Sequence, residues 1–295
     1  MKNIFLIVNP NSGTKDYSIV LNLVINEFEK AKIEYALNKT EYSGHAIDLV
    51  HSCDVSKYDS VCAVGGDGTL YEVLNGMLTR DDNMKIPIGL IPGGTGNSFM
   101  KTIDCLDPVD AINKILSKIP MSIDVMKVNT SDKKYYSLNL VGWGMATDIS
   151  VFAEKLRIIG GQRYNIASIF EIIKNKKREA RLIVDGKERQ GDFCFIISCN
   201  TKYIGKGMKM APNALIDDGL IDLIIVKKTS RSTLLSVFPK LFNGTHIDHD
   251  ACEYLQCRSF SIIPKENGQL NIDGEIIGYT PVDVDIIKEG IELFV

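Results

Sequence analysis

Several features are scarce or absent in this chain of 295 residues, and each absence excludes a class of protein. No apolar run approaches the roughly 20 residues that are needed to span a bilayer. The formal net charge of −3 lacks the basic excess that is typical of nucleic-acid binders, so no nucleic-acid partner is expected. The seven cysteines are odd in number and include no C-x-x-C pair, which predicts reduced, mostly buried thiols in a cytoplasmic protein.

The chain also lacks internal repeats, low-complexity segments and a long linker. Its first residues, MKNIFLIVNPNSG, superficially resemble a signal peptide, but the apolar part is only Ile4 to Val8 and no small-residue cleavage site follows. We therefore expect a buried first strand. The length is sufficient for two domains.

The most informative stretch runs from Ser60 to Asn97. Its two short apolar runs, Val61–Val64 and Ile86–Ile91, each end in glycines that lead into a helical pattern. Glycine permits φ > 0 and lets backbone N–H groups approach a ligand closely. A helix N-terminus adds oriented donors and positive partial charge, so two such loops on adjacent strands predict a polyphosphate site.

Residues 1–120 alternate strand and helix four times, which predicts an α/β domain with a parallel sheet and right-handed crossovers. Ligands bind beyond the carboxyl ends of the strands in such sheets. Four loops lie at these ends: 9–13, 40–46, 65–69 and 93–97.

Residues 121–295 contain long, partly alternating strands, which predict a second, mostly antiparallel domain. Asp185-Gly186 is typical of a tight hairpin. Helical patterns interrupt the strands at Ser150–Ile173 and Ser232–Phe242. The assignment of the last strand to either domain stays open, and a cleft between the domains is the expected ligand site.

GGDGT (Gly65 to Thr69) followed by PGGTGN (Pro92 to Asn97) resembles the lipid-kinase superfamily of diacylglycerol and sphingosine kinases, in particular its soluble bacterial diacylglycerol-kinase-like branch. SLNLVGWG (Ser137 to Gly144), PNA (Pro212 to Ala214) and a late DGE triplet follow in the family's order. The resemblance implies a nucleotide-binding domain like that of NAD kinase and phosphofructokinase, a β-sandwich second domain, and ATP- and Mg²⁺-dependent phosphorylation of a hydroxyl on a membrane-derived lipid.

The same resemblance implies which residues bind the nucleotide. They are Asn9, Pro10, Asn11, Ser12, Gly13, Thr40, Gly65, Gly66, Asp67, Gly68, Thr69, Leu70, Tyr71, Gly94, Thr95, Gly96 and Asn97. Asp67 would coordinate Mg²⁺ or order its waters, since Mg²⁺ prefers hard oxygen ligands.

A second, structural Mg²⁺ is implied at Asp218 with the backbone carbonyls of Leu215 and Leu220. The alternative is a plain acidic turn before a strand, because Asp-Gly turns are common. Both interpretations stay open on the sequence.

The catalytic base is expected in the segment Asn271 to Glu275. The resemblance implies that its carboxylates face the nucleotide loops across the cleft, with Glu275 as the proton acceptor and Asp273 supporting it through hydrogen bonds or metal. Asp273-Gly274 is also typical of a plain hairpin. Which of Asp67, Asp273 and Glu275 is the general base stays open.

The acceptor lipid is expected in an apolar groove of the second domain, at a membrane surface. The basic run Lys174, Lys176, Lys177 and Arg178 closes a helical pattern that carries apolar residues. It indicates either peripheral docking on an anionic membrane or a solvated helix end, which the helix dipole favours anyway. The acceptor's identity and a homodimeric state are left open.

Two rival functions remain. NAD kinase shares a related fold and a GGDG loop, but it follows that loop with an Asn-Glu pair, and the only such pair here is Asn26-Glu27, before the loop. A non-catalytic lipid- or nucleotide-binding relative would be expected to lose Asp67, Asp273 or Glu275, and all three are present.

Overall fold

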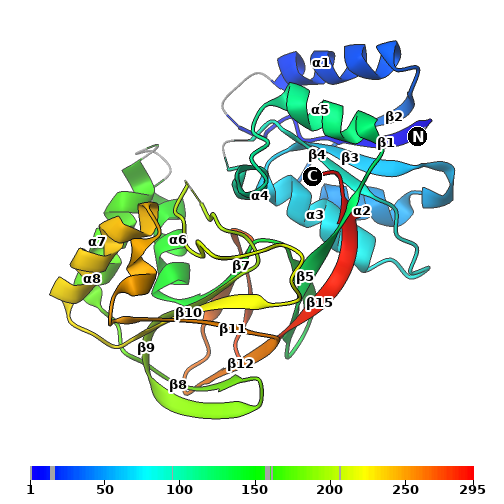
Figure 1. Cartoon of the computed structure of the whole chain (residues 1–295). Helices are drawn as coiled ribbons and strands as arrows, with labels where there is room; N and C mark the ends of the chain where they lie inside the picture. The colour runs from blue at the N-terminus through cyan, green and yellow to red at the C-terminus, as the bar shows by residue number, and fades with distance from the viewer. Residues whose placement is uncertain (1, 14–16, 95, 157–159, 161, 206) are drawn as a thin grey trace. The chain divides into compact units, whose positions relative to one another are not determined.

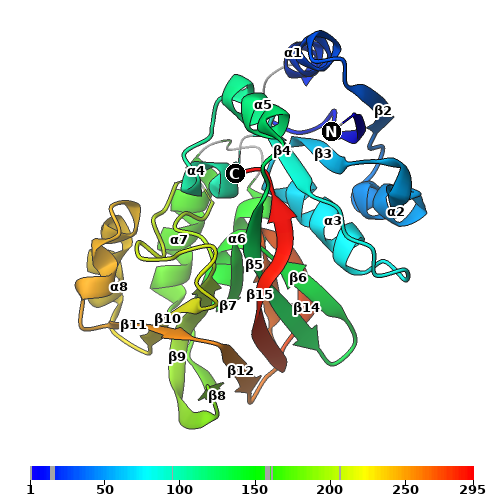
Figure 2. The same cartoon turned by 45° about the vertical axis from the view of Figure 1, so that its right-hand side comes forward.

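The computed structural model describes residues 2–13, 17–94, 96–156, 160, 162–205 and 207–295. The chain divides into two compact units: unit 1 comprises Met1–Val125 and Lys288–Val295, and unit 2 comprises Met126–Ile287. The last strand, β15 (Val282–Leu293), begins in unit 2 and ends in unit 1, where Leu293 pairs with Ile88. This strand is drawn in red in Figure 2.

Unit 1 is an α/β unit, as predicted, with parallel strands in the order β2-β1-β3-β4. Its elements are β1 (Asn3–Val8), α1 (Tyr17–Lys30), β2 (Glu34–Lys39), α2 (His45–Ser52), β3 (Ser60–Gly65), α3 (Asp67–Leu78), β4 (Ile88–Pro92), α4 (Ser98–Thr102), α5 (Pro108–Ser117) and the start of β5 (Met121–Thr130). Helices α1 and α5 cover one face of the sheet, and α2 and α3 cover the other (Figure 1).

Strands β1, β3 and β4 of unit 1 are mostly apolar and buried because helices cover both faces of the sheet, whereas the edge strand β2 contains charged, exposed residues. Strand β3 is buried at every residue, and β1 is buried from Ile4 to Val8. On the side of α1 and α5, Phe28 and Ile112 pack against Leu6 and neighbouring strand residues. This packing holds the carboxyl ends of the strands, and therefore the loops that follow them, in one place.

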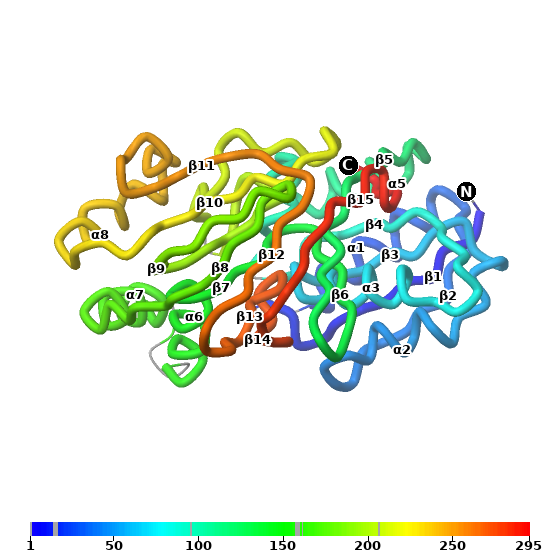
Figure 3. The backbone as a smooth tube through the Cα atoms, turned by 90° about the horizontal axis from the view of Figure 1, so that it is seen from below, coloured from blue at the N-terminus to red at the C-terminus, as the bar shows by residue number. Residues whose placement is uncertain are grey.

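Unit 2 is mostly antiparallel, as predicted, with neighbouring strands in the order β14-β13-β7-β9-β8-β12 and with β10 and β11 continuing from β9. Its elements are β6 (Lys134–Ser137), β7 (Leu140–Gly144), α6 (Met145–Lys155), α7 (Arg163–Lys174), β8 (Arg178–Val184), β9 (Lys187–Cys199), β10 (Ile221–Lys227), α8 (Arg231–Val237), β11 (Cys252–Cys257), β12 (Ser259–Pro264), β13 (Gln269–Ile272) and β14 (Glu275–Tyr279). Figure 3 shows β9, β8 and β12 side by side.

Local sequence signals in unit 2 account for several of these elements. Asp185 and Gly186, with φ of 46° and 76°, form the predicted two-residue hairpin between β8 and β9. Gly160, with φ of 66°, lies between α6 and α7. Helix α6 begins at Met145, five residues before the start of the predicted helical pattern at Ser150. Short 3₁₀ segments, Phe238–Phe242 and Thr245–Asp248, follow α8.

All seven cysteines are buried and none forms a disulfide, as predicted. Among the described residues, no helix is long and apolar enough to cross a membrane.

Candidate active site

The loops that follow β1, β3 and β4 pack directly on one another at their glycines. A Cβ on Gly66 would lie 2.7 Å from the carbonyl oxygen of Gly96, and one on Gly13 would lie 2.5 Å from that of Gly93. Gly13 also has φ of 80°, which disfavours a side chain. Close packing between loops therefore requires these glycines, in addition to any close approach of a ligand.

Polar contacts join the loop after β1 to the start of α3. The side-chain amide of Asn9 donates to the hydroxyl of Thr69 over 3.2 Å, and the hydroxyl of Ser12 donates to the carbonyl of Asn9 over 2.9 Å. The backbone N–H of Asn11 donates to Asn9 Oδ1 over 3.0 Å. The predicted residues of these two loops thus form one connected group in unit 1.

Asp67 joins the other two loops. Its carboxylate accepts hydrogen bonds from the backbone N–H groups of Ser98, over 2.8 Å, and Phe99, over 3.2 Å, at the start of α4. Its own N–H donates to the carbonyl of Gly96 over 3.0 Å. A carboxylate at a helix N-terminus is stabilised by the helix dipole. Since an ionised carboxylate offers about four lone pairs, Asp67 retains acceptor capacity for a cation or its waters.

The side-chain amide of Asn97 lies at these loops and is only partly hydrogen-bonded by the protein. Its Nδ2 donates to the carbonyl of Gly94 over 2.9 Å. Its Oδ1 is buried and has no hydrogen-bond partner among the described residues. Because buried acceptors are nearly always satisfied, a ligand or ordered water is expected beside it. The loops of unit 1 therefore fit a polar ligand such as a nucleotide.

The other residues predicted for the nucleotide lie around this group. Leu70 and Tyr71 are buried in α3, so their side chains pack in unit 1. Thr40 is buried at the end of β2, where its N–H donates to the carbonyl of Val8 over 2.9 Å. Thr95 lies outside the described residues.

In unit 2, Asp273 lies at a hairpin turn and is fully engaged by protein donors. The turn joins β13 to β14 with φ of 51° at Asp273 and 100° at Gly274. The carboxylate accepts hydrogen bonds over 2.6 to 2.8 Å from Ser137 Oγ and from the backbone N–H groups of residues 138, 139 and 140. Burial raises the pKa of Asp273 to about 6, although these hydrogen bonds oppose the shift. Asp273 is therefore both a hairpin residue and a buried anchor for the 137–140 turn.

Glu275 differs from the other two predicted carboxylates in its exposure. It is the first residue of β14, where it pairs with Ile272, and it is exposed, whereas Asp273 is buried and Asp67 is partly buried. Glu275 is therefore accessible to a substrate, whereas Asp273 stabilises the turn that precedes it.

Unit 2 also contains a mostly apolar cavity of about 280 Å³. Its wall is built from β7, β9, α6, α7 and α8 and includes Met145, Ile149, Phe195, Ile204 and Phe238. Asn271 and Gly274 complete the wall, so the cavity reaches the turn that precedes Glu275. The resemblance to lipid kinases led us to expect an apolar groove in this unit, and the sequence did not identify its residues.

Asn271 connects the cavity wall to this turn. Its Nδ2 donates to Ser150 Oγ on α6 over 2.9 Å, and its Oδ1 accepts a hydrogen bond from the N–H of Gly274 over 2.9 Å. Helix α6 and the turn before Glu275 are thereby held in one arrangement.

The predicted metal residue Asp218 lies in a turn before β10. Its Oδ1 accepts a hydrogen bond from the N–H of Leu220 over 2.9 Å, and its Oδ2 lies 3.5 Å from Gln256 Nε2. The sequence analysis missed Asp222, which is fully buried on β10 and whose Oδ2 has no hydrogen-bond partner among the described residues. Burial, with the negative charge of Asp218 nearby, raises the pKa of Asp222 to about 6.

These carboxylate oxygens are of the hard type that Mg²⁺ prefers. Among the described residues no three acidic, His or Cys side chains cluster as metal ligands, so a cation here would also require backbone carbonyls such as those of Leu215 and Leu220. Asp222 could have been found in the sequence, because it is the one charged residue within the otherwise apolar run Ile221–Val226.

Two family models match most of this chain. The family model of the diacylglycerol kinase catalytic domain matches residues 3–128, and that of the YegS C-terminal NAD kinase beta sandwich-like domain matches residues 139–295. Diacylglycerol kinase of Staphylococcus saprophyticus is 31% identical over 98% of this chain and 94% of its own length. Sphingosine kinase 1 of Arabidopsis thaliana is 29% identical over 94% of this chain and 68% of its own length.

Solved structures show the same fold. A diacylglycerol kinase from Bacillus anthracis matches with a TM-score of 0.82 at 24% identity, over 99% of this chain and 96% of the other. An NAD kinase from Archaeoglobus fulgidus, solved in complex with ATP, matches with a TM-score of 0.52 at 13% identity, over 99% and 93%. The predicted α/β fold with an antiparallel sandwich is confirmed.

The two family models together define a kinase with a catalytic domain and a β-sandwich domain. The chain belongs to the lipid-kinase family of diacylglycerol and sphingosine kinases, as its glycine motifs predicted, and it is an enzyme.

Proposed function

We propose that this enzyme transfers the γ-phosphate of ATP to a hydroxyl of a membrane-derived lipid, such as diacylglycerol or a sphingoid base. The observation that carries the proposal is the apolar cavity in unit 2, whose wall ends at Asn271 and Gly274, next to Glu275. An apolar cavity with a few polar groups at one end suits a molecule with a hydrocarbon chain and a polar end.

In this proposal, the loops of unit 1 bind ATP. The N-terminus of α3 suits anionic phosphates, and Asn97 Oδ1 accepts a hydrogen bond from the nucleotide. Mg²⁺, when bound, neutralises charge on the phosphates. Asp67 keeps the glycine loops together and orders the cation's waters. A structural Mg²⁺ would be held by Asp218, assisted by Asp222 and the nearby carbonyls.

Unit 2 binds the acceptor lipid and contributes the general base. The cavity excludes water from the lipid's chain, and Glu275 accepts the proton of the lipid hydroxyl as the bond to phosphorus forms. Asp273 acts through the backbone of the turn, because its own oxygens are occupied by four protein donors. The enzyme would work in the cytoplasm, bound peripherally to a membrane.

The test is transfer of labelled γ-phosphate from ATP in the presence of Mg²⁺. Diacylglycerol, sphingosine, ceramide and phosphatidylglycerol are presented in mixed micelles, and NAD serves as the soluble competitor. A labelled lipid is expected. Label in NAD alone would assign the chain an NAD kinase activity, and no label despite ATP binding would indicate a binding protein or an untried acceptor.

A further inference from the structure

Helix α7 exposes most of its large apolar side chains, and apart from Ile172 its buried residues are small or polar. Four side chains, which we call the α7 stripe, follow the spacing of one helix face and are about half exposed: Ile166 at 42%, Ile169 at 47%, Phe170 at 42% and Ile173 at 57%. The buried residues of the helix are Ala167, Ser168, Glu171 and Ile172. A helix that packed only within its own unit would have the reverse distribution, with its larger apolar side chains inside.

Basic residues surround this stripe. Residues 163–178 and 227–242 together contain nine basic side chains and one acidic side chain, a formal charge of +8 in a chain whose net charge is −3. The one acidic residue, Glu171, is buried and pairs with Lys174 over 2.9 Å. Five acidic residues from other segments pair with basic side chains of these two segments, and including them leaves a local formal charge of +3.

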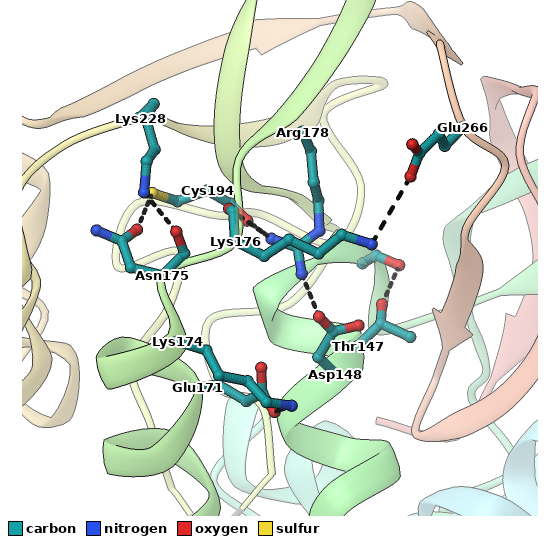
Figure 4. A network of polar contacts seen from close by, with 11 residues as sticks. Thr147, Asp148, Glu171, Lys174, Asn175, Lys176, Arg178, Cys194, Lys228 and Glu266 are labelled. Carbon is teal, nitrogen blue, oxygen red and sulfur yellow. Dashed lines mark hydrogen bonds and ion pairs between the residues drawn. The ribbon is translucent and has the colours of Figure 1, made fainter.

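The two basic segments meet at the C-terminal end of α7. Asn175 Nδ2 donates to the carbonyl of Thr229 over 2.9 Å, and Lys228 Nζ donates to the carbonyl of Asn175 over 2.5 Å. Figure 4 shows this region, with Lys176 directed toward Glu266, 4.0 Å away. Lys176 and Lys177 remain more than 60% exposed despite their acidic partners.

The opposite side of α7 lines the apolar cavity through Tyr164, Ser168 and Ile172. The stripe and the cavity wall are thus two sides of one helix, which is about 10 Å thick. A bilayer that contacted the stripe would lie about one helix diameter from the cavity.

We propose that the α7 stripe, with Lys176 and Lys177 beside it, docks the enzyme on an anionic bilayer surface, from which the lipid reaches the cavity. The inference rests on the proposed function in that the acceptor is a membrane lipid. Amphipathic helices bind at the interface through an apolar face, and nearby cations add attraction to anionic lipids. A second copy of this chain would bring two surfaces of the same positive sign together, so an anionic bilayer is the favoured occupant.

Two double variants separate the apolar and charged contributions in sedimentation with vesicles of phosphatidylcholine, alone or mixed equally with phosphatidylserine. Ile169→Asn with Ile173→Asn should weaken binding to both kinds of vesicle by at least tenfold. Lys176→Gln with Lys177→Gln should weaken binding to the anionic vesicles alone by about 25-fold, roughly fivefold per lysine.

Matched controls lie in unit 1. Ile19 and Ile119 are 69% and 75% exposed, and replacing both by Asn should leave vesicle binding unchanged. Lys30 and Lys57 are exposed lysines with acidic partners, like Lys176 and Lys177, and replacing both by Gln should also have no effect. Unchanged thermal unfolding of every variant shows that the fold is intact.

Measurements of lipid phosphorylation then test the docking surface separately from the proposed kinase function. The stripe variant should keep wild-type phosphorylation of a lipid in detergent micelles and lose it when the same lipid is presented in vesicles. Vesicle binding that is equal for the wild type and the stripe variant would overturn the docking surface, as would a wild-type dimer that the stripe variant dissociates. Vesicle binding without phosphorylation of any lipid would refute the proposed function and leave the docking surface standing.

Discussion

The hydroxyl of Ser137 lies 2.6 Å from Oδ1 of Asp273, a residue 136 positions later in the chain. This contact and three backbone hydrogen bonds to the same carboxylate join the turn before β7 to the turn that precedes Glu275. The buried carboxylate of Asp273 therefore helps to fix the position of the turn that leads to the exposed carboxylate of Glu275.

The titration of Asp273 should be measurable in the stability of the protein. Its pKa of about 6 in the folded state exceeds that of an unfolded aspartate, about 3.9, so the native state binds this proton more tightly. The carboxyl's stabilising contribution is complete below pH 4 and is lost as the pH rises to about 6. Relative to Asp273→Asn, the wild-type free energy of unfolding should fall by on the order of 3 kcal/mol between pH 4 and pH 7.

Urea unfolding of both proteins across this pH range measures that difference. The other titrating groups are shared by the two proteins and cancel in the comparison. A difference that stays constant with pH, or that rises, would contradict a raised pKa at Asp273.

The glycine loops of unit 1 should respond selectively to alanine. A Cβ on Gly66 would lie 2.7 Å from the carbonyl oxygen of Gly96, whereas a Cβ on Gly96 would meet only Asp67 Oδ2, at 3.5 Å. Gly66→Ala should therefore displace the loops and weaken ATP binding at least tenfold in calorimetry, while Gly96→Ala, which leaves the loop packing in place, should weaken it much less. Equal effects of the two substitutions would contradict the loop packing described here.

Mg²⁺ should stabilise unit 2 through Asp218. A cation that binds the folded state alone raises the unfolding temperature, by an amount that grows with its concentration. We expect millimolar Mg²⁺ to raise the unfolding temperature of the wild type in the absence of nucleotide, and to do so much less for Asp218→Asn. Asp81→Asn is the control, because it removes an exposed carboxylate of unit 1 that lies outside the glycine loops. The same Mg²⁺ response in Asp218→Asn would rule out a site at this residue.

A larger side chain in the cavity should weaken binding of the acceptor lipid and leave ATP binding unchanged. Ala146 lines the cavity on α6, and Ala146→Leu adds volume there. We expect it to raise the KM for a long-chain acceptor several-fold, with a smaller effect on a short-chain one and none on the KM for ATP. Ala146→Ser, which adds little volume, should resemble the wild type. An unchanged KM for the long-chain acceptor in Ala146→Leu would place the lipid elsewhere.

Much of this structure follows from local sequence signals. Buried strands that end in glycine predicted the loops of unit 1, and Asp185-Gly186 predicted its hairpin. The pairing of Asp273 with the 137–140 turn could not be predicted, because it joins distant segments. Periodicity likewise identified an apolar face on α7 without showing that this face is exposed, since burial depends on the neighbours that tertiary packing provides.

Replacement of Glu275 by Gln tests whether this carboxylate accepts the proton of the lipid hydroxyl. It removes the proton acceptor and keeps the size of an exposed side chain, so ATP affinity and the unfolding temperature should not change. Transfer of labelled phosphate from ATP to the preferred lipid should show a kcat lower by about 10²- to 10⁴-fold, the usual contribution of a general base. Full activity of Glu275→Gln would show that Glu275 is not the general base.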